Sequence, residues 1–587
     1  MGAPHSTNAP GLRALLAAVV ALPLAAVSFG SWQGQVVYVL YREPKLAAIQ
    51  FLGWALLGCL FRVYRDDFRT GELLAGLWRP PWRWLALFLV YGLATGLWIE
   101  VPANLFYELS QYGLLLLLVI ALGAWSVRDP AVPRIVEHGL VLSLGAAVLV
   151  GLVQATFPLA VLSPIDPGSG VANPSVLGHK NVMALAVVGQ IFLLLRLVLA
   201  CGPCRRGRLL ALLLAAELVY LASLESRTSY LALLAGAAVL AALLGVRGWL
   251  RPRVVLSGGL AAALFLAALA VDPGARSRAG SVVSYLSHPS RYLESDRGIY
   301  LLNSFQMVRH HPFGVGLGDW QTWYPLYRLH DRDQHFTEAV QVRRAHSDHV
   351  QALAETGWPG LVFWLAFLGS LLAGAVRASL RSETWEPLLL AAQVAAYGAA
   401  MATDAVAEHP YLKLEFFLVA FLAARRTAPR SAFRGGPSRW LAPGIALLAV
   451  AGMGYAVCLA WKADLAATAT ARYVAAMRYG GRPDLDPFEW MRLEEGSRAG
   501  EAMARTPGYF KGLSDDYRVL AQIDLRLGRR RRALSYARDS LRFHPYSPNT
   551  FRLMAELLQK RRPTAASRWS RAADHIMNEA TRGYEAP

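Results

Sequence analysis

Apolar residues in this chain gather into blocks close to 20 residues long, and this arrangement constrains the fold more than any other feature. Hydrophobic residues occupy 55% of the 587 positions, whereas charged residues occupy 17%. A helix needs about 20 apolar residues to cross the ~30 Å of hydrocarbon in a bilayer, and a soluble core does not sort its apolar residues in this way. The sequence therefore predicts an all-α, polytopic membrane protein. We expect about thirteen transmembrane helices, near 12–30, 45–61, 82–98, 109–126, 138–157, 181–200, 209–224, 229–246, 254–271, 358–376, 387–403, 411–424 and 440–461.

Basic residues are concentrated in every second connection between these segments. They follow the second, fourth, sixth, eighth, tenth and twelfth segments, in the ranges 62–83, 128–134, 196–208, 247–253, 377–381 and 425–439. By the positive-inside rule, this alternation predicts a cytoplasmic N-terminus and places the long loop 272–357 and the C-terminal tail outside. The first segment lacks a clear small-residue cleavage site, so we expect it to be retained. Topology thus accounts for the net charge of +19, and we exclude nucleic acid as a partner.

The composition changes after the last apolar segment. We expect a polytopic membrane domain over 1–461, with the outer loop 272–357 inside it, and a helical domain over 462–587. Within the tail, Tyr517, Leu520 and Ala521 are followed 34 positions later by Phe551, Met554 and Ala555, a spacing that resembles tetratricopeptide repeats. Such repeats typically bind other proteins, so the tail is a candidate site for an envelope partner; a generic helical tail is the alternative.

Two histidines stand near the end of the outer loop, in the segment His346-Ser347, nine further residues, and Gly357-Trp358-Pro359-Gly360. The zinc-protease pattern needs the second histidine four residues after the first and a glutamate directly after the first. Because neither condition holds, we predict no metal site. Imidazole, with an ordinary pKa of ~6.5, can act as a general base near neutral pH. His346 is therefore the candidate base, and a structural pairing of His346 with His349 is the alternative.

The same loop contains glycines at 314, 316 and 318. Their lack of a side chain lets the backbone approach a ligand or another chain segment closely. The phosphate-loop lysine spacing is absent, so a nucleotide-binding loop is rejected.

These residues together resemble the bacterial O-antigen ligase and O-antigen polymerase superfamily. The signature of a His-Ser pair, nine residues and Gly-x-x-Gly is matched over 346–360. Further similarity lies in Ser226-Arg227, in the stretch 178–181, and in Arg297 with the stretch 311–320, so that the resemblance covers about 170–425. It implies a membrane glycosyltransferase of the all-helical C type in the inner membrane. Its outer loop and tail would lie in the periplasm, and it would take a glycan from undecaprenyl diphosphate without a metal, nucleotide sugar or other cofactor.

The resemblance also suggests roles for individual residues. His346 would be the catalytic base, while Arg227 and Arg297 would bind the diphosphate, because guanidinium stays charged and makes bidentate contacts with phosphate oxygens. Lys180 and Asn181 are expected to add phosphate or sugar contacts, and His349 is a secondary positioning candidate. Structural alternatives remain open. They are an ion pair of Arg227 with Glu225 or Glu217, an ion pair of Arg297 with Asp296 or Glu294, and a Lys180 side chain that reaches the membrane interface.

Three classes of function fit this sequence. The first is an enzyme, with an O-antigen ligase that uses lipid A-core as acceptor preferred to a repeat-unit polymerase because the motif match is compact. The second is a transporter or flippase of the lipid-linked glycan, in which Glu217 would mark ion coupling. Ion-coupled transport normally requires several charged residues within the spans, and Glu217 is expected to be nearly alone there, which favours the enzyme. A scaffold that works through the tail is the third class.

Overall fold

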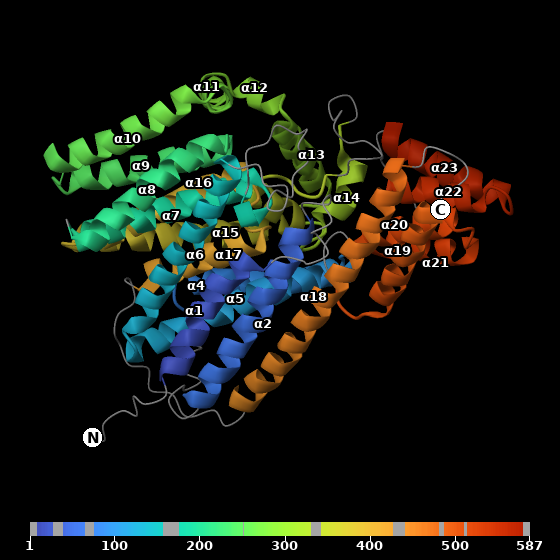
Figure 1. Ribbon diagram of the computed structural model, residues 1–587, viewed down its shortest axis with the longest axis horizontal. Coiled ribbons are helices and arrows are strands. Elements are labelled where there is room, and N and C mark those ends of the chain that lie inside the picture. Colours follow the sequence, from blue (N-terminus) through green and yellow to red (C-terminus); the bar gives the residue numbers. More distant parts are fainter. Residues whose placement is uncertain are drawn as a thin grey trace.

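The computed structural model describes residues 9–26, 39–64, 76–156, 175–202, 204–249, 252–329, 342–425, 441–479, 487–509 and 513–578. Every regular element among these residues is a helix, which confirms the predicted all-α class. Figure 1 shows a bundle of long helices on one side and a group of shorter helices, α19–α23, at the C-terminal side.

Each expected apolar segment coincides with a helix. These helices are α1 (Ala9–Ala25), α2 (Val39–Val63), α4 (Trp82–Ala94), α5 (Pro102–Arg128), α6 (Ala131–Thr156), α7 (Lys180–Cys201), α8 (Arg205–Ser223), α9 (Arg227–Val246), α10 (Pro252–Val271), α15 (Asp348–Arg381), α16 (Glu386–Thr403), α17 (Pro410–Arg425) and α18 (Leu441–Tyr479). Among the described residues, seven helices are long and apolar enough to cross a membrane, or eight with the bent pair formed by α10 and the helix after it. The remaining expected spans are shorter or more polar, so length and composition alone support fewer membrane spans than the thirteen expected.

The arginine-rich connections meet at one end of the bundle. Arg196 pairs with Glu137 at 2.7 Å and with Glu386 at 3.1 Å, and these residues belong to three connections expected on the cytoplasmic side. Arg247, from a fourth such connection, donates to the carbonyl of Leu380 at 2.7 Å. Connections that were expected on the same side of the membrane are thus in contact with one another. Which side of the membrane this end faces stays a prediction.

The bundle interior contains more ionisable groups than the sequence suggested. Glu217 on α8 and Glu415 on α17 are almost completely buried and within electrostatic reach of each other. Lys413, also on α17, pairs with Glu108 on α5 at 3.2 Å. The expectation that Glu217 stands nearly alone in the spans is therefore wrong, because Lys413 and Glu415 lie inside another expected span, 411–424.

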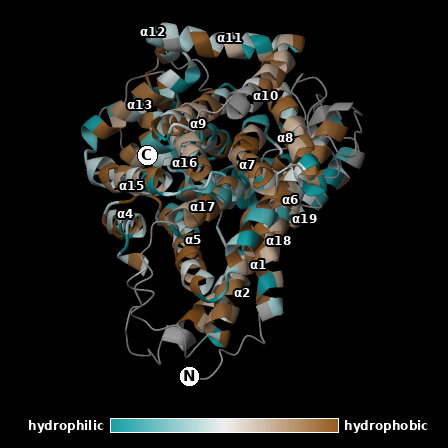
Figure 2. Ribbon diagram, turned by 90° about the vertical axis from the view of Figure 1, so that its left-hand side faces the viewer, coloured by the Kyte–Doolittle hydropathy of each residue, from teal (hydrophilic) through white to brown (hydrophobic). Residues whose placement is uncertain are grey.

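Before α15, the described part of the outer loop contains the helices α11 (Pro273–Ser287), α12 (Pro289–Leu293), α13 (Asp296–His310) and α14 (Trp320–Tyr327). The chain bends by 112° between α10 and α11. Asp272 stabilises this bend, because its carboxylate accepts the amide hydrogens of Gly274 and Ala275 at the start of α11. Figure 2 shows predominantly hydrophobic bundle helices below an α11 and α12 of mixed hydropathy, as expected for an extramembrane cover.

The glycine-rich loop terminates the first half of α15. Gly357 has a φ of 63° and breaks this helix, so the carbonyls of Ala354 and Glu355 lack helical partners. The amides of Val315 and Gly316 donate to these two carbonyls at 3.0 and 2.9 Å. A Cβ on Gly314 would lie 2.3 Å from the Glu355 carbonyl oxygen. The glycine spacing therefore serves close approach to another chain segment, one of the two expected uses.

The tail begins without a break at the expected boundary, because α18 is one 39-residue helix that continues past position 461. It is followed by α19 (Pro487–Arg505), α20 (Leu513–Arg526), α21 (Arg530–Phe543), α22 (Pro548–Leu558) and α23 (Pro563–Asn578). Tyr517, Leu520 and Phe551, three residues of the 34-residue pattern, are buried. The last four helices form two packed pairs, α20 with α21 and α22 with α23, and their tetratricopeptide character stays a prediction.

Candidate functional site

His346 and Asp404 form a hydrogen-bonded pair outside the helical spans. His346 stands directly before Ser347, whose side chain accepts the Val350 amide and caps α15. Its Nδ1 lies 3.2 Å from an oxygen of Asp404, which ends α16. The ring of Tyr300 stacks on the imidazole with 5.7 Å between centroids. This arrangement fixes the plane of the ring and directs Nδ1 toward the carboxylate.

Arg297 completes this arrangement from α13. Its guanidinium donates to the second oxygen of Asp404 at 2.9 Å, to the carbonyl of Thr403 at 2.7 Å and to the hydroxyl of Thr228. The expected alternative, an ion pair with Asp296 or Glu294, is not the contact that Arg297 makes. Thr228 directly follows Arg227, so the contact also brings the start of α9 beside the pair of His346 and Asp404, which we call the dyad.

The charge states of the pair follow from these contacts. Burial opposes ionisation of Asp404, but Arg297 and His346 hold the pKa of its carboxyl well below its usual range. Burial lowers the pKa of His346, and the hydrogen bond and charge of Asp404 only partly oppose it. An anionic carboxylate therefore faces a neutral imidazole whose Nδ1 carries the proton, which leaves Nε2 able to accept one.

A second group of cations lies at the starts of α7 and α9. Arg227 donates to the hydroxyl of Tyr285 at 2.8 Å and stacks over its ring at 5.4 Å. Glu225 pairs instead with Lys180 at 3.5 Å and with Arg278 at 3.9 Å, so Lys180 has a defined partner on the protein. Two helix N-termini also meet here, and their free amide groups favour anions.

Arg344 and His179 connect the two groups. Burial and the charge of Arg344 lower the pKa of His179 to about 4, although the charge of Asp404 opposes them. Cations outnumber carboxylates across the whole site, which consequently attracts an anion.

Backbone strain is concentrated in the same segments. Among the described residues, three non-glycine positions have positive φ, namely Ser175 at 56°, Glu225 at 50° and His346 at 51°. They stand in the segments that carry Lys180, Arg227 and the dyad, respectively. Such conformations cost about 1–3 kcal/mol each and concentrate at functional sites.

The remaining sequence candidates occupy different positions. Asn181 lies half-buried in the first turn of α7, beside Lys180. His349 is turned away from the dyad: Nε2 lies 3.3 Å from the carbonyl of Gly398, and Nδ1 accepts the indole N–H of Trp364 at 3.1 Å. The structure therefore brings together His346, Arg297, Arg227 and Lys180, whereas His349 contributes to the contact between α15 and α16.

Sequence reasoning missed Asp404 and Arg344. Asp404 lies in a short connection between two apolar segments, and Arg344 is a loop residue two positions before His346. A carboxylate at the outer end of an apolar segment was the available signal for Asp404, but no spacing tied it to His346.

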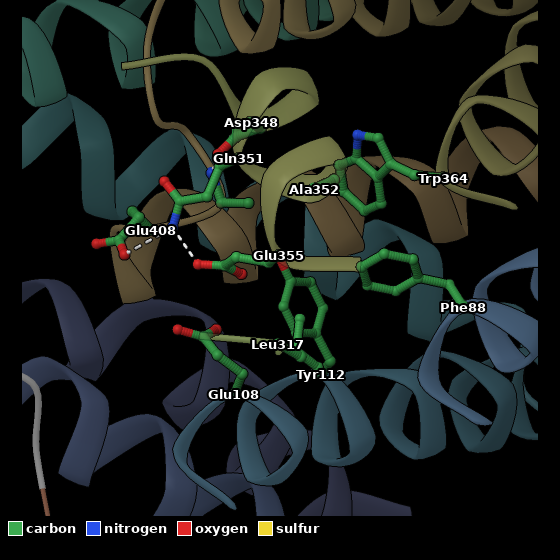
Figure 3. Close-up of a pocket in the computed structure, with 11 residues that line it drawn as sticks. Phe88, Glu108, Tyr112, Leu317, Asp348, Gln351, Ala352, Glu355, Trp364 and Glu408 are labelled. Atoms are coloured by element: carbon green, nitrogen blue, oxygen red, sulfur yellow. Dashed lines mark hydrogen bonds between the residues drawn. The ribbon is translucent and has the colours of Figure 1, made fainter. Parts of the chain in front are cut away.

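A small cavity lies between α5, α15 and the connection 404–409 (Figure 3). Its volume of about 30 Å³ holds one or two waters, so it is too small for a sugar. Gln351 donates to Glu355 at 3.0 Å and to Glu408 at 3.4 Å across it (Figure 3). These hydrogen bonds stabilise the segments that carry Asp404 and His346, and the cavity is not the substrate site.

The described residues contain no group of three His, Cys, Asp or Glu side chains arranged to hold a metal ion. Residues 209–365 match the model of the O-antigen ligase family. No curated protein matches the chain.

The O-antigen ligase match covers just over a quarter of the 587 residues. It includes Arg227, Arg297 and His346, but Lys180, Asp404 and the tail lie outside it. In this region the chain is similar to membrane enzymes of the O-antigen ligase type. Together with the apolar helices, the match supports a multi-pass inner-membrane protein.

Proposed function

We propose that the protein transfers a glycan from undecaprenyl diphosphate to a sugar hydroxyl of lipid A-core at the periplasmic face of the inner membrane. The observation that carries this proposal is the pairing of a neutral His346 with Asp404 beside a basic surface at two helix N-termini. The first feature suits activation of a hydroxyl, and the second suits a diphosphate. The N-terminus would then be cytoplasmic, and the loop and tail periplasmic.

His346 acts as the general base. Nε2 accepts the proton of the acceptor hydroxyl while the hydroxyl oxygen attacks the anomeric carbon from the side opposite the diphosphate. The bond from carbon to the diphosphate oxygen breaks with both electrons on oxygen, so the configuration inverts. The imidazolium that forms is stabilised by Asp404 at 3.2 Å, and general-base catalysis of this kind contributes ~10²–10⁴ in rate.

Fixed cations stabilise the leaving diphosphate. Arg227 is the main candidate, because its described contacts are to a tyrosine and no carboxylate neutralises it. Lys180, Asn181 and the free amides of α7 and α9 add to this surface, and Arg297 contributes the part of its charge that Asp404 does not neutralise. Such preorganised donors act where negative charge develops in the transition state, so the mechanism needs no metal or cofactor.

The glycolipid profile of cells that lack the protein tests the function. Long glycans that accumulate on the lipid carrier and are absent from lipid A-core support a ligase. Single repeat units in place of chains support the alternative, a polymerase whose acceptor is another lipid-linked glycan. A profile that stays normal rejects both.

One observation favours a second candidate, a transporter of the lipid-linked glycan. The buried carboxyls of Glu217 and Glu415 are the kind of group that ion-coupled transport uses. In vesicles that hold the glycan donor, a transporter would move the donor across the bilayer whether or not position 346 is alanine. Movement that requires no acceptor and survives His346→Ala supports this candidate.

A further inference from the structure

The C-terminal domain contacts the outer loop on both sides of 330–341. On one side, Arg328 donates to the carbonyls of Ile576 and Met577 at the end of α23. On the other side, Arg343 pairs with Asp515 in the first turn of α20 at 2.6 Å. Figure 1 shows α14 next to the C-terminal helices. The tail therefore holds the loop shortly before the segment that carries Arg344 and His346.

The pair of Arg343 and Asp515 is charged and half-buried. Burial opposes ionisation of Asp515, but the charge of Arg343 holds the pKa of this carboxyl below its usual value. The side chains of Arg343 and Asp515 are 33% and 28% exposed, so water screens their attraction only in part. Glu43 on α2 lies within electrostatic reach of Arg343, which places this arginine where the membrane domain, the loop and the tail meet.

The segment 342–347 is held from both sides although it contains no regular helix. On the side of the membrane domain and outer loop, Ala345 is buried in a cluster with Met307 and Trp320, and Ser347 donates to the Met401 carbonyl at 3.2 Å. His346 keeps a φ of 51°, and a non-glycine residue stays in this conformation only when its surroundings determine it strongly. On the side of the tail, the pair of Arg343 and Asp515 holds the same segment.

We infer that the tail positions the catalytic segment, with Arg343 and Asp515 as positioning residues for His346. This inference rests on the proposed glycosyl transfer. In this role the tail needs no contact with glycan or partner protein. The ion pair across the domain boundary holds the backbone just before His346. Loss of the pair lowers the rate of the chemical step and leaves donor binding at Arg227 nearly unchanged.

Steady-state transfer by the full-length protein in lipid vesicles tests this inference, with donor and acceptor both supplied. For Asp515→Asn we expect kcat to fall about tenfold, which corresponds to ~1.4 kcal/mol, while KM for the donor changes less than twofold. Asp574→Asn is the matched control, because Arg552 and Asp574 form a pair of the same 2.6 Å length inside the tail. This control should keep full activity. Arg343→Gln should lower kcat by a similar factor, and the double variant Arg343→Gln with Asp515→Asn should lower it little further, because both substitutions remove the same pair.

The outcomes separate this inference from the proposed function. If Asp515→Asn and Asp574→Asn have the same kcat, the positioning role is rejected. The same holds if the double variant lowers kcat by the product of the two separate losses, or if the loss follows a lower thermal unfolding temperature. If His346→Ala keeps full activity, the proposed function itself fails, whatever the tail variants do.

Discussion

Replacing Asp404 by asparagine removes the charge that stabilises His346 in the transition state and keeps the size of the side chain. At 3.2 Å and an effective dielectric constant of about 20, opposite unit charges attract by roughly 5 kcal/mol. Arg297 occupies the second oxygen of Asp404, so part of this attraction is already compensated. We therefore expect about half of it, ~2.5–3 kcal/mol, to be lost from the transition state, and a fall in kcat of about 10².

The same substitution has a signature in the pH profile. The base works in its neutral form, so activity is lost as pH falls through the pKa of His346. Asp404 raises this pKa against the effect of burial. Asp404→Asn should therefore lower the pKa of His346, and the acidic limb of kcat/KM should move to lower pH.

Transfer rates measured across pH with the purified protein in vesicles test both effects, with Asp574→Asn as a carboxylate control remote from the dyad. A loss in kcat below threefold would refute the reasoning. An acidic limb that moves to higher pH would do so as well.

Four further results are expected. Arg344→Gln removes a cation that lowers the pKa of His346, so the acidic limb of kcat/KM should move to higher pH, opposite to Asp404→Asn; an unchanged limb would contradict the assigned environment. Arg227→Ala should raise KM for the diphosphate donor about tenfold, the loss of roughly one charge-assisted contact, and Arg227→Lys should raise it less in the same titration. His349→Ala should lower stability by about 1–3 kcal/mol, because the indole N–H of Trp364 loses its buried acceptor, and a melt in detergent should show this with kcat of the folded protein retained. Gly314→Ala, at a φ of 87°, should cost about 2 kcal/mol or more, and an unchanged melting temperature would contradict the close packing of this loop.

The helices could be predicted from the sequence because the signal is local. Blocks of apolar residues determine where helices form in a membrane, and each expected segment coincides with one. The close approach of the glycine-rich loop to another chain segment also followed from the absence of a side chain on glycine. The number of spanning helices was less well determined, because helices such as α16 and α17 are shorter or more polar than an isolated span requires.

The site was predicted only where a motif carried it. His346 and Arg297 stood out by their residue types and by resemblance, but their shared partner, Asp404, lies 58 positions from His346 in a connection without a distinctive pattern. The pair of Arg343 and Asp515 spans 172 positions. Such contacts arise when helices pack against one another, and no periodicity along the chain reports them. Glu415 and Lys413 are a different case, because they lie inside the expected segment 411–424 and the sequence alone shows them.

The most direct test of the account is the transfer rate of purified His346→Ala in vesicles that contain undecaprenyl-diphosphate-linked glycan and lipid A-core. We expect a rate ~10²–10⁴ below that of the unmodified protein, with donor binding retained. A variant that transfers glycan at the unmodified rate would show that His346 is not the base and would contradict the proposed mechanism.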